Sequence, residues 1–350
     1  MPAVAAGAPG LDSPAVTTRP TIYDVARAAG VAPSTVSRAL GRPARVSAHT
    51  AELVRRVATE LGYSRQARTA SADRSSMVVA LVMSDITNPH SAEIVRGAEQ
   101  EAAEGGYTML LCDTRESVTR EADVLRRVLP VVDGVVLASS RLTDDEVAAV
   151  AATRPTVVLN RSAVSVPSIA LDDARAALLV VEHLHGLGHR TIAYVGGPRN
   201  SPVEAERRAG VEQAADALGV GLVGLAAAGP TLRAGAGLAD DVAGAGVSAV
   251  VAYNDLLAIG LLQALRRNGT RVPEDIGVVG FDNIPLGRLV SPQLTSVGAP
   301  LQAMGASAMR NLLQQLASTG RATVRSARLP VRLVVRQSTG PAPAHGSRRR

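Results

Sequence analysis

The sequence predicts an N-terminal all-α helix-turn-helix headpiece followed by an α/β core of two doubly wound parallel-sheet lobes. Near the N-terminus, apolar residues recur at helical spacing over two short stretches that a Gly-containing turn separates. From residue 78 onward, short aliphatic runs alternate with Ala-rich amphipathic stretches, which indicates parallel strands covered by helices on both faces. Roughly 260 residues of this pattern are too many for one small sheet, so two lobes are expected.

Residues 21–40, TIYDVARAAGVAPSTVSRAL, are predicted to form the first two helices. Thr21 can cap the first helix with Asp24 as its capping-box partner, and Gly30 suits the left-handed residue that ends it. Pro33 fits the first turn of the second helix, where a missing N–H leaves no hydrogen bond unmade. The pattern alone also fits two helices of any small bundle. In a helix-turn-helix the second helix enters the major groove of DNA. Its outward-facing polar residues are Ser34, Thr35, Ser37 and Arg38.

A third helix is predicted after the polar Gly/Pro turn at residues 41–45. Either Ser47 or Thr50 can cap this helix. Arg55 and Arg56 fit two interpretations equally well, phosphate contacts or ordinary exposed charges. The apolar residues expected to pack back on the first two helices are Leu53, Val54, Val57 and Leu61.

Charge is unevenly distributed along the 350 residues, whose net charge is +6. The first 70 residues hold nine Arg against four acidic residues, whereas residues 71–340 hold 25 Arg against 27 acidic residues. The positive charge therefore lies where the helix-turn-helix is predicted, as phosphate binding requires. Residues 1–20 are interpreted as a disordered arm and residues 341–350 as a basic tail.

The composition and motifs argue against secretion, membrane insertion and catalysis. A single cysteine, Cys112, fits a reducing cytoplasm, and we find neither a signal peptide nor an apolar run of about 18 residues. A phosphate loop, a nucleophile elbow and a zinc-protease motif are also absent, so we expect no enzyme activity and no cofactor. The spacing of His183, His185 and His189 suits hydrogen bonds at a helix end better than a metal site, so we expect no metal.

Polar residues follow the predicted strands of the core. In open α/β sheets, ligands bind outside the carboxyl ends of the strands, and two such rims facing one another would form a cleft for a hydroxylated small molecule. For any single Asp or Asn, capping of the following helix is an equally good explanation. The residues that follow strands are Asp85, Asn88, Asp113, Thr114, Ser139, Ser140, Asn160, Arg161, Asp172, Asp173, Arg199, Asn200, Asn254, Asp255, Asp282 and Asn283.

Residues 21–63 resemble the DNA-binding headpiece of the LacI/GalR family of bacterial transcriptional regulators. The matching motifs are T-I-Y-D-V-A, V-A-P-S-T-V-S-R-A-L, R-V-S-A-H-T and the closing L-G-Y. The resemblance continues to the closing strand near 336–338. It implies a cytoplasmic regulator, expected to be a repressor. It further implies a homodimer, with a tetramer not excluded, that binds a palindromic double-stranded DNA operator and is controlled by a small-molecule effector.

The resemblance also implies a periplasmic-binding-protein type of core at residues 77–340. Lobe one is expected at about 77–162 plus 292–323, and lobe two at about 163–291 plus 324–340. The alternative that we keep open is a small-molecule (sugar) binding protein whose DNA-binding role is weak.

For the headpiece at 21–63, the resemblance implies that Pro33 and Ser34 open the recognition helix and read base edges. Arg38 corresponds to another base-contacting position and can donate two hydrogen bonds to guanine. Thr35 and Ser37 are expected to hold phosphates. Ala32 replaces the family's usual Ser, which removes a helix cap. Further DNA-binding candidates are Thr21, Tyr23, Arg45, His49, Arg65 and Arg68.

The hinge at 64–76, SRQARTASADRSS, departs most from the family pattern. Arg65 and Gln66 replace the usual Pro-Asn, and the position of the Leu that wedges between base steps falls on Ser71 or Ala72. Neither side chain can unstack a base step as Leu does. We therefore expect a smaller DNA kink than in the family, with charge from Arg65 and Arg68; a strong operator bend in a gel-phasing measurement would contradict this expectation.

For the effector site, the resemblance singles out Arg207 in A-E-R-R-A-G and Asp282 in G-F-D-N. The first loop reads Asn88-Pro89-His90-Ser91 where the family has Asn-Pro-Phe. Because the chain has no Trp and one Phe, stacking surfaces for a sugar are scarce, although Tyr253 could substitute. The effector is expected to be sugar-like or nucleoside-like and held mainly by hydrogen bonds. The effector-binding candidates are Asp85, Asn88, His90, Asp113, Ser139, Arg161, Arg207, Tyr253, Asn254, Asp255 and Asp282.

Overall fold

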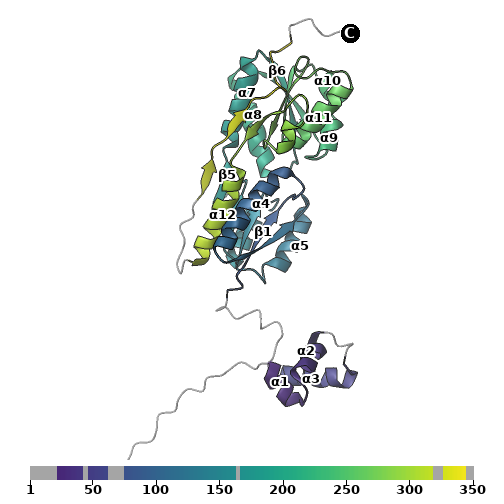
Figure 1. Ribbon diagram of the computed structural model, residues 1–350, viewed down its shortest axis with the longest axis vertical. Helices are drawn as coiled ribbons and strands as arrows, with labels where there is room; N and C mark the ends of the chain where they lie inside the picture. Colours follow the sequence, from purple (N-terminus) through teal and green to yellow (C-terminus); the bar gives the residue numbers. More distant parts are fainter. Residues whose placement is uncertain (1–21, 42–45, 62–74, 163–165, 318–325, 344–350) are drawn as a thin grey trace, which may run out of the picture. The chain divides into compact units, whose positions relative to one another are not determined.

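The computed structural model describes residues 22–41, 46–61, 75–162, 166–317 and 326–343 (Figure 1). Within helices of the headpiece, the side chains of Ile22, Tyr23, Ser34 and Ser37 also lie outside the description. The chain divides into a headpiece and a core, which are considered separately. The predicted arm at 1–20 and nearly all of the predicted hinge and basic tail lie outside the described residues. No helix of the described chain is long and apolar enough to cross a lipid bilayer.

The headpiece contains the predicted three helices, α1 (Ile22–Ala29), α2 (Pro33–Gly41) and α3 (Ala48–Glu60). Gly30 has φ +64°, and the N–H of Val31 donates to the carbonyl of Ala26 at 3.0 Å, which confirms the predicted glycine-terminated helix end. The core of the headpiece is formed by apolar residues from all three helices, chiefly Val25, Val36, Val54 and Val57.

Two details of the third helix were left open or predicted wrongly. Ser47, and not Thr50, is the N-cap of α3, because its side chain accepts a hydrogen bond from the N–H of Thr50. Leu61 was expected to pack on the first two helices, but it follows the last residue of α3 and is 40% exposed. Its backbone still has right-handed helical angles, so the side chain continues the spiral of α3 and lies on an exposed side of it.

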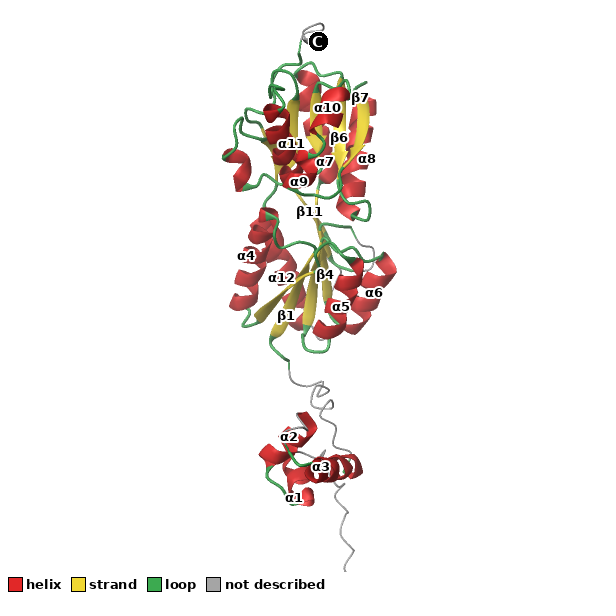
Figure 2. Ribbon diagram, turned by 90° about the vertical axis from the view of Figure 1, so that its right-hand side faces the viewer, coloured by secondary structure: helices red, strands yellow, loops and turns green. Residues whose placement is uncertain are grey.

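Lobe one contains a six-stranded sheet in the order β11-β5-β4-β3-β1-β2. The central strands are fully buried, as expected for parallel strands with helices on both faces. Helices α4 and α12 cover one face, and α5 and α6 the other (Figure 2). The strands are β1 (Val78–Met83), β2 (Thr108–Asp113), β3 (Gly134–Ala138), β4 (Thr156–Leu159), β5 (Ser168–Leu171) and β11 (Ala327–Leu329). The helices are α4 (Pro89–Glu104), α5 (Val118–Val128), α6 (Asp144–Thr153) and α12 (Leu301–Ala317).

Lobe two repeats this architecture around a sheet in the order β12-β10-β9-β8-β6-β7, in which β12 runs antiparallel to β10. Helices α7 and α8 pack on one face and α9, α10 and α11 on the other. The strands are β6 (Thr191–Gly196), β7 (Gly221–Ala226), β8 (Ala249–Ala252), β9 (Gly277–Phe281), β10 (Thr295–Gly298) and β12 (Arg332–Val334). The helices are α7 (Asp173–Gly186), α8 (Pro202–Ala217), α9 (Leu232–Ala236), α10 (Ala239–Gly244), α11 (Asp255–Arg267) and the short 3-10 helix η3 (Pro285–Arg288).

The expected lobe boundaries were wrong for three strands, which pair in the sheet of the other lobe. The segments expected to begin at 163 and 324 were assigned to lobe two, yet their first strands, β5 and β11, pair with each other in the lobe-one sheet. The segment from 292 was assigned to lobe one, yet its strand β10 pairs with β9 in lobe two. The described chain therefore passes between lobes after β5, after β10 and between β11 and β12. The physical reason is that β5, β10 and β11 each satisfy their backbone hydrogen bonds by pairing with a neighbouring strand before the chain crosses to the other lobe.

Glycines allow close packing of two helix pairs, α12 on α4 in lobe one and α11 on α9 in lobe two. In lobe one, a Cβ atom at Gly305 of α12 would overlap the carbonyl oxygen of Ile94 in α4. In lobe two, a Cβ atom at Gly260 of α11 would overlap the carbonyl oxygen of Leu232 in α9. This packing holds the returning helix α12 on lobe one, as the sequence predicts for the segment near 292–323.

Candidate functional site

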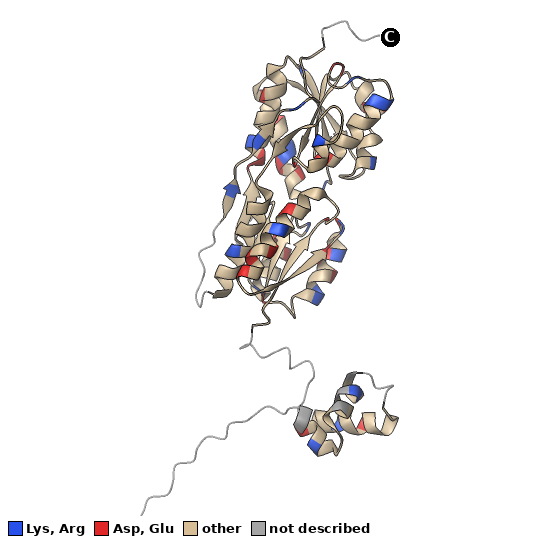
Figure 3. Cartoon of the chain, in the orientation of Figure 1, with Lys and Arg blue, Asp and Glu red and all other residues tan. Residues whose placement is uncertain are grey.

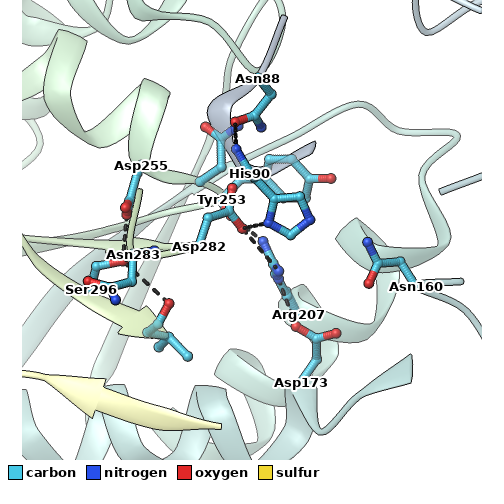
Figure 4. Close-up of polar contacts among 12 residues, drawn as sticks. Asn88, His90, Asn160, Asp173, Arg207, Tyr253, Asp255, Asp282, Asn283 and Ser296 are labelled. Carbon is cyan, nitrogen blue, oxygen red and sulfur yellow. Dashed lines mark hydrogen bonds and ion pairs between the residues drawn. The ribbon is translucent and has the colours of Figure 1, made fainter. Parts of the chain in front are cut away.

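A cleft lies between the lobes, where the carboxyl ends of strands from both sheets meet (Figure 4). Eight of the eleven side chains expected to bind an effector line this cleft in the described chain. Lobe one contributes Asp85, Asn88, His90 and Ser139, and lobe two contributes Arg207, Tyr253, Asn254 and Asp282. The geometry thus brings these predicted residues together, while their role as effector ligands stays a prediction.

Strained backbone marks the strand ends around the cleft. Ser139, Asn160 and Asp282, which follow β3, β4 and β9, have φ angles of +53°, +58° and +103°. Non-glycine residues adopt such angles at a cost of about 1–3 kcal/mol each, and this strain concentrates at functional sites. Asn160 also donates a hydrogen bond from Nδ2 to Oγ of Ser139 at 3.0 Å. All three of these residues line the cleft.

Arg207 on α8 organises the lobe-two wall. Its Nε donates to Oδ1 of Asp173 at 2.7 Å, its Nη1 donates to the carbonyl of Tyr253 at 2.7 Å, and its Nη2 lies 3.6 Å from Oδ1 of Asp282. The guanidinium carbon also lies 4.6 Å from the ring centre of Phe281. Burial alone would lower the pKa of Arg207, but Asp173 and Asp282 raise it above its ordinary value. The cation is thus firmly charged and already paired with carboxylates.

Tyr253 forms another part of that wall but offers little free ring surface. Its side chain packs so closely on Gly197 that a Cβ atom there would lie 2.5 Å from the ring. The guanidinium carbon of Arg207 lies 5.3 Å from the ring centre, and the phenol oxygen lies 3.3 Å from Oγ of Ser201. Burial raises the pKa of Tyr253, so the phenol keeps its proton. The residue is 9% exposed, which limits its use as a stacking surface.

His90, in the first turn of α4, reaches across from lobe one. Its Nδ1 lies 3.5 Å from Oδ1 of Asp282 in lobe two, and the two side chains are 11% and 6% exposed. Burial lowers the pKa of His90; Asp282 and Asp173 oppose this shift, and Arg207 adds to it. The imidazole is therefore neutral at neutral pH.

The polar residues at the strand ends often serve as helix caps as well. Oδ1 of Asn88 accepts from the N–H of His90 at the start of α4, and Oδ1 of Asn254 accepts from the N–H of Leu257 at the start of α11. Asp172 caps α7 in the same way without lining the cleft. Capping and cleft formation are thus compatible at Asn88 and Asn254, since the start of a helix that follows a strand lies at the cleft rim.

Three predicted effector residues do not line the cleft. Asp113 accepts from the N–H of Arg115 at 3.2 Å, within its own turn. Arg161 is buried inside lobe one, where it donates to the carbonyl of Leu142 at 2.7 Å and pairs with Asp144. In each case the strand-end position was right, but a nearby partner turns the side chain away from the cleft.

Asp255 is the third of these residues and lies below the cleft floor. It is completely buried and accepts from Oγ of Ser296 at 2.6 Å and from the N–H of Ile284 at 2.8 Å. Burial, together with the nearby carboxylate of Asp282, raises the pKa of Asp255 well above its ordinary value. Asp255 therefore holds the backbone after β9 through Ile284 and is absent from the described lining of the cleft.

The sequence analysis missed an ion pair on the lobe-one wall. Nε of Arg141 donates to Oε2 of Glu116 at 2.7 Å, and both residues line the cleft. Glu116 is the third residue after β2 and Arg141 is the third residue after β3, so a search extended past the first polar residues after each strand would have found them. The other lining residues that were not chosen are Met83, Ser84, Ser91, Ile94, Asn160, Val203 and Pro230.

Two of the three histidines of the HLHGLGH segment, His183 and His189, make side-chain contacts within lobe two. Nε2 of His183 lies 3.0 Å from Oγ1 of Thr339. The fully buried His189 lies 2.8 Å from Oγ of Ser248 and 3.1 Å from the carbonyl of Gly340. The bonds to Thr339 and Gly340 fasten the C-terminal segment to α7 and to the loop that follows it.

In the headpiece, the described helices carry four Arg side chains (Figure 3): Arg27, Arg38, Arg55 and Arg56. Arg27 and Arg55 have acidic neighbours three residues earlier, 3.7 Å and 3.0 Å away. Arg38, Pro33 and His49 are exposed and Thr35 is half-buried, while their contacts with DNA stay predictions. The remaining candidates lie outside the described residues or have undescribed side chains: Thr21, Tyr23, Ser34, Ser37, Arg45, Arg65 and Arg68.

Comparisons with known proteins agree with this arrangement. Residues 21–66 match the family described as bacterial regulatory proteins, lacI family, and residues 181–339 match a periplasmic binding protein-like domain. The HTH-type transcriptional regulator DegA of Bacillus subtilis is 32% identical over 344 residues, covering 92% of this chain and 98% of the relative. The chain belongs to the LacI family. It is accordingly a DNA-binding transcriptional regulator of the bacterial cytoplasm, in a family of regulators and not of enzymes.

Two solved structures of LacI-family type match most of the chain. The lac repressor dimer bound to operator and the anti-inducer ONPF superposes with a TM-score of 0.69 at 28% identity, covering 92% of this chain and 100% of the other. The complex of the transcriptional regulator CelR with cellobiose gives a TM-score of 0.68 at 31% identity, covering 91% and 100%. The predicted fold of headpiece plus periplasmic-binding-protein type core is thereby confirmed.

Proposed function

We propose that this LacI-family regulator is a repressor that binds a palindromic operator as a homodimer and responds to an uncharged, hydroxyl-rich effector, sugar-like or nucleoside-like, in the cleft. The observation that carries the proposal is the cleft itself, because side chains of both lobes point into one polar space. A ligand that bridges Asn88 or Ser139 of lobe one and Asn254 or Asp282 of lobe two would bind the closed arrangement of the lobes most tightly.

The charges around the cleft favour an uncharged ligand over an anion. Both cations that line it are already paired, Arg141 with Glu116, and Arg207 with Asp173 and Asp282. Asp85 adds a further carboxylate, which accepts hydrogen bonds from Thr87. A phosphate or carboxylate group on the ligand would meet this excess of negative charge, whereas hydroxyl groups can donate to it.

Isothermal titration calorimetry across hexoses, pentoses, disaccharides, nucleosides and their phosphates tests the ligand class. The proposal expects binding of an uncharged compound and a much weaker response to its phosphorylated form. Asp282→Asn should weaken binding, while His185→Asn, at the far end of α7, should leave it unchanged. Tighter binding of the phosphorylated compound would refute the charge argument, and strong hexose binding abolished by Tyr253→Ala would favour stacking over hydrogen bonding.

Exposed apolar side chains support the homodimer. Leu110 and Leu111 on the edge strand β2 are 40% and 39% exposed, and Leu289 after η3 is 80% exposed. A single recognition helix reads few base pairs, and a second copy doubles the contacts to a palindrome. Sedimentation should therefore show a dimer that Leu289→Asp shifts toward monomer, with Val131→Asp as an exposed control. A monomeric wild-type chain would contradict the homodimer.

Sequencing of genomic fragments captured by the purified chain tests the operator. We expect enrichment of one short palindrome, and addition of a metabolite extract should change its capture. Loss of capture with extract would indicate induction, and gain would indicate co-repression. A folded dimer that enriches no sequence would overturn the repressor proposal and favour a ligand-binding protein with weak DNA binding.

A further inference from the structure

The contact between His90 and Asp282 spans the cleft. His90 belongs to α4 of lobe one, whereas Asp282 follows β9 of lobe two, and Nδ1 lies 3.5 Å from Oδ1 (Figure 4). Both side chains are nearly buried in this arrangement. A separation of the lobes would take the imidazole away from the carboxylate and expose it to water.

The closed cleft leaves the imidazole poorly satisfied. Nδ1 of His90 is buried and has no hydrogen-bond partner among the described residues. The charged groups that act on His90 are Asp282 after β9, Arg207 on α8 and Asp173 at the start of α7. Three more charged residues, all of lobe one, line the same cleft: Asp85, Glu116 and Arg141. Oδ1 of Asp282 is also shared with Nη2 of Arg207 at 3.6 Å, so its charge is partly neutralised before it acts on the histidine.

We propose that closure of the two lobes is coupled to loss of a proton from His90, so that acid opens the cleft and weakens effector binding. The effector half of this inference rests on the proposed function. The coupling between lobe closure and the proton on His90 does not depend on that function, because it can be measured without any ligand.

The direction follows from the two environments of His90. Burial in the closed cleft lowers the pKa of His90, with Arg207 acting in the same direction and the two carboxylates against it. In an open cleft the ring is hydrated, and its pKa returns toward the ordinary value of 6.5. Protons therefore bind the open form better, and closure is favoured as the pH rises. Because one proton is involved, the ratio of closed to open changes at most tenfold per pH unit.

Distances between spin labels on the full-length chain test the lobe movement. Cysteines replace the exposed Thr119 of α5 and Arg233 of α9 in a Cys112→Ser background, and dilution with unlabelled chain suppresses distances between protomers. Double electron–electron resonance is measured at about pH 5 and about pH 8, on either side of an ordinary histidine pKa. We expect a larger population of long distances at the lower pH.

Substitutions then assign the effect to His90. His90→Asn and His90→Gln keep a polar side chain that cannot titrate, and both should give the same distances at the two pH values. His185→Asn should behave as the wild type, because that histidine lies at the end of α7. The proposal is overturned if the wild-type distances do not change with pH, or if both His90 variants keep the change, which would point to another group such as Asp255.

Titration with cellobiose and with ribose at the same pH values tests the effector half. We expect the affinity of a sugar that binds to fall with decreasing pH in the wild type and to stay constant in His90→Asn. A constant wild-type affinity would refute the coupling to the effector. If neither sugar binds while the distances still respond to pH, the proposed ligand class fails and the lobe coupling stands.

Discussion

Arg207→Ala should destabilise the core by about 3–5 kcal/mol, the usual effect of removing one partner of a buried ion pair. The Arg207 side chain is 5% exposed, and its loss leaves the buried carboxylates of Asp173 and Asp282 without their cation. The lost hydrogen bond to Tyr253 and the lost contact with the Phe281 ring each add about 1 kcal/mol or less. The uncompensated charges are therefore the dominant effect.

The adjacent Arg208 is a matched control on the same helix. Its side chain is 38% exposed, and its partner Glu204 also accepts hydrogen bonds from the hydroxyl of Tyr194 and the N–H of Gly197. Glu204 thus stays partnered in Arg208→Ala, and that variant should lose only about 1 kcal/mol or less. Urea unfolding followed by circular dichroism measures both, since the chain has no Trp for fluorescence.

A double-mutant cycle isolates the electrostatic part. Asp173→Ala removes one of the two stranded carboxylates, so combining it with Arg207→Ala should cost less than the sum of the single variants, with a coupling of about 2–3 kcal/mol. The reasoning is refuted if Arg207→Ala loses no more stability than Arg208→Ala, or if the double variant is additive.

Three further outcomes are expected. Arg38→Ala should abolish operator discrimination in a binding titration, whereas Arg56→Ala should weaken binding to all sequences alike; unchanged selectivity without Arg38 would refute its base-reading role. Burial and a neighbouring carboxylate raise the pKa of Asp255 in the folded chain above its ordinary 3.8. The protonated side chain therefore stabilises the fold fully below pH 3.8, and this stabilisation is lost as the pH rises through the pKa of the folded chain. Asp255→Asn should flatten this dependence in urea midpoints, and parallel curves for the two proteins would contradict it. Gly305→Ala should lower the free energy of unfolding by about 1–3 kcal/mol because its Cβ overlaps a carbonyl of α4. Gly186→Ala, whose Cβ meets open space in a helix, should leave the melting temperature unchanged or raise it; a Gly305→Ala melting temperature no lower than that of the wild type would argue against the close helix packing.

Local chemistry made the headpiece predictable. Gly30 ends α1 in the left-handed region, Pro33 opens α2, and Ser47, one of the two predicted candidates, caps α3. Each acts through contacts a few residues away in the chain. Such short-range requirements are written directly in the residue types. The prediction that Leu61 packs on the first two helices was wrong, because burial depends on the tertiary packing of α3 and not on residue type alone.

The cleft was predictable as a region but not residue by residue. The sequence places polar residues after strands, and parallel topology brings strand ends together, so eight predicted side chains meet there. Whether a given side chain enters the cleft depends on its nearest partner. Arg161 is held by Leu142 and Asp144 inside lobe one, whereas Arg141 pairs with Glu116 at the cleft surface.

By itself, the sequence determined the helix-turn-helix, the two doubly wound lobes and the family, because periodicity, caps and turn residues act over short distances along the chain. The tertiary structure decided which sheet β5, β10 and β11 join, since a strand's choice of partner depends on ladders formed with distant segments. It also decided that His90 of one lobe meets Asp282 of the other. Contacts across a cleft depend on how two separately folded lobes approach, and no local pattern records that approach.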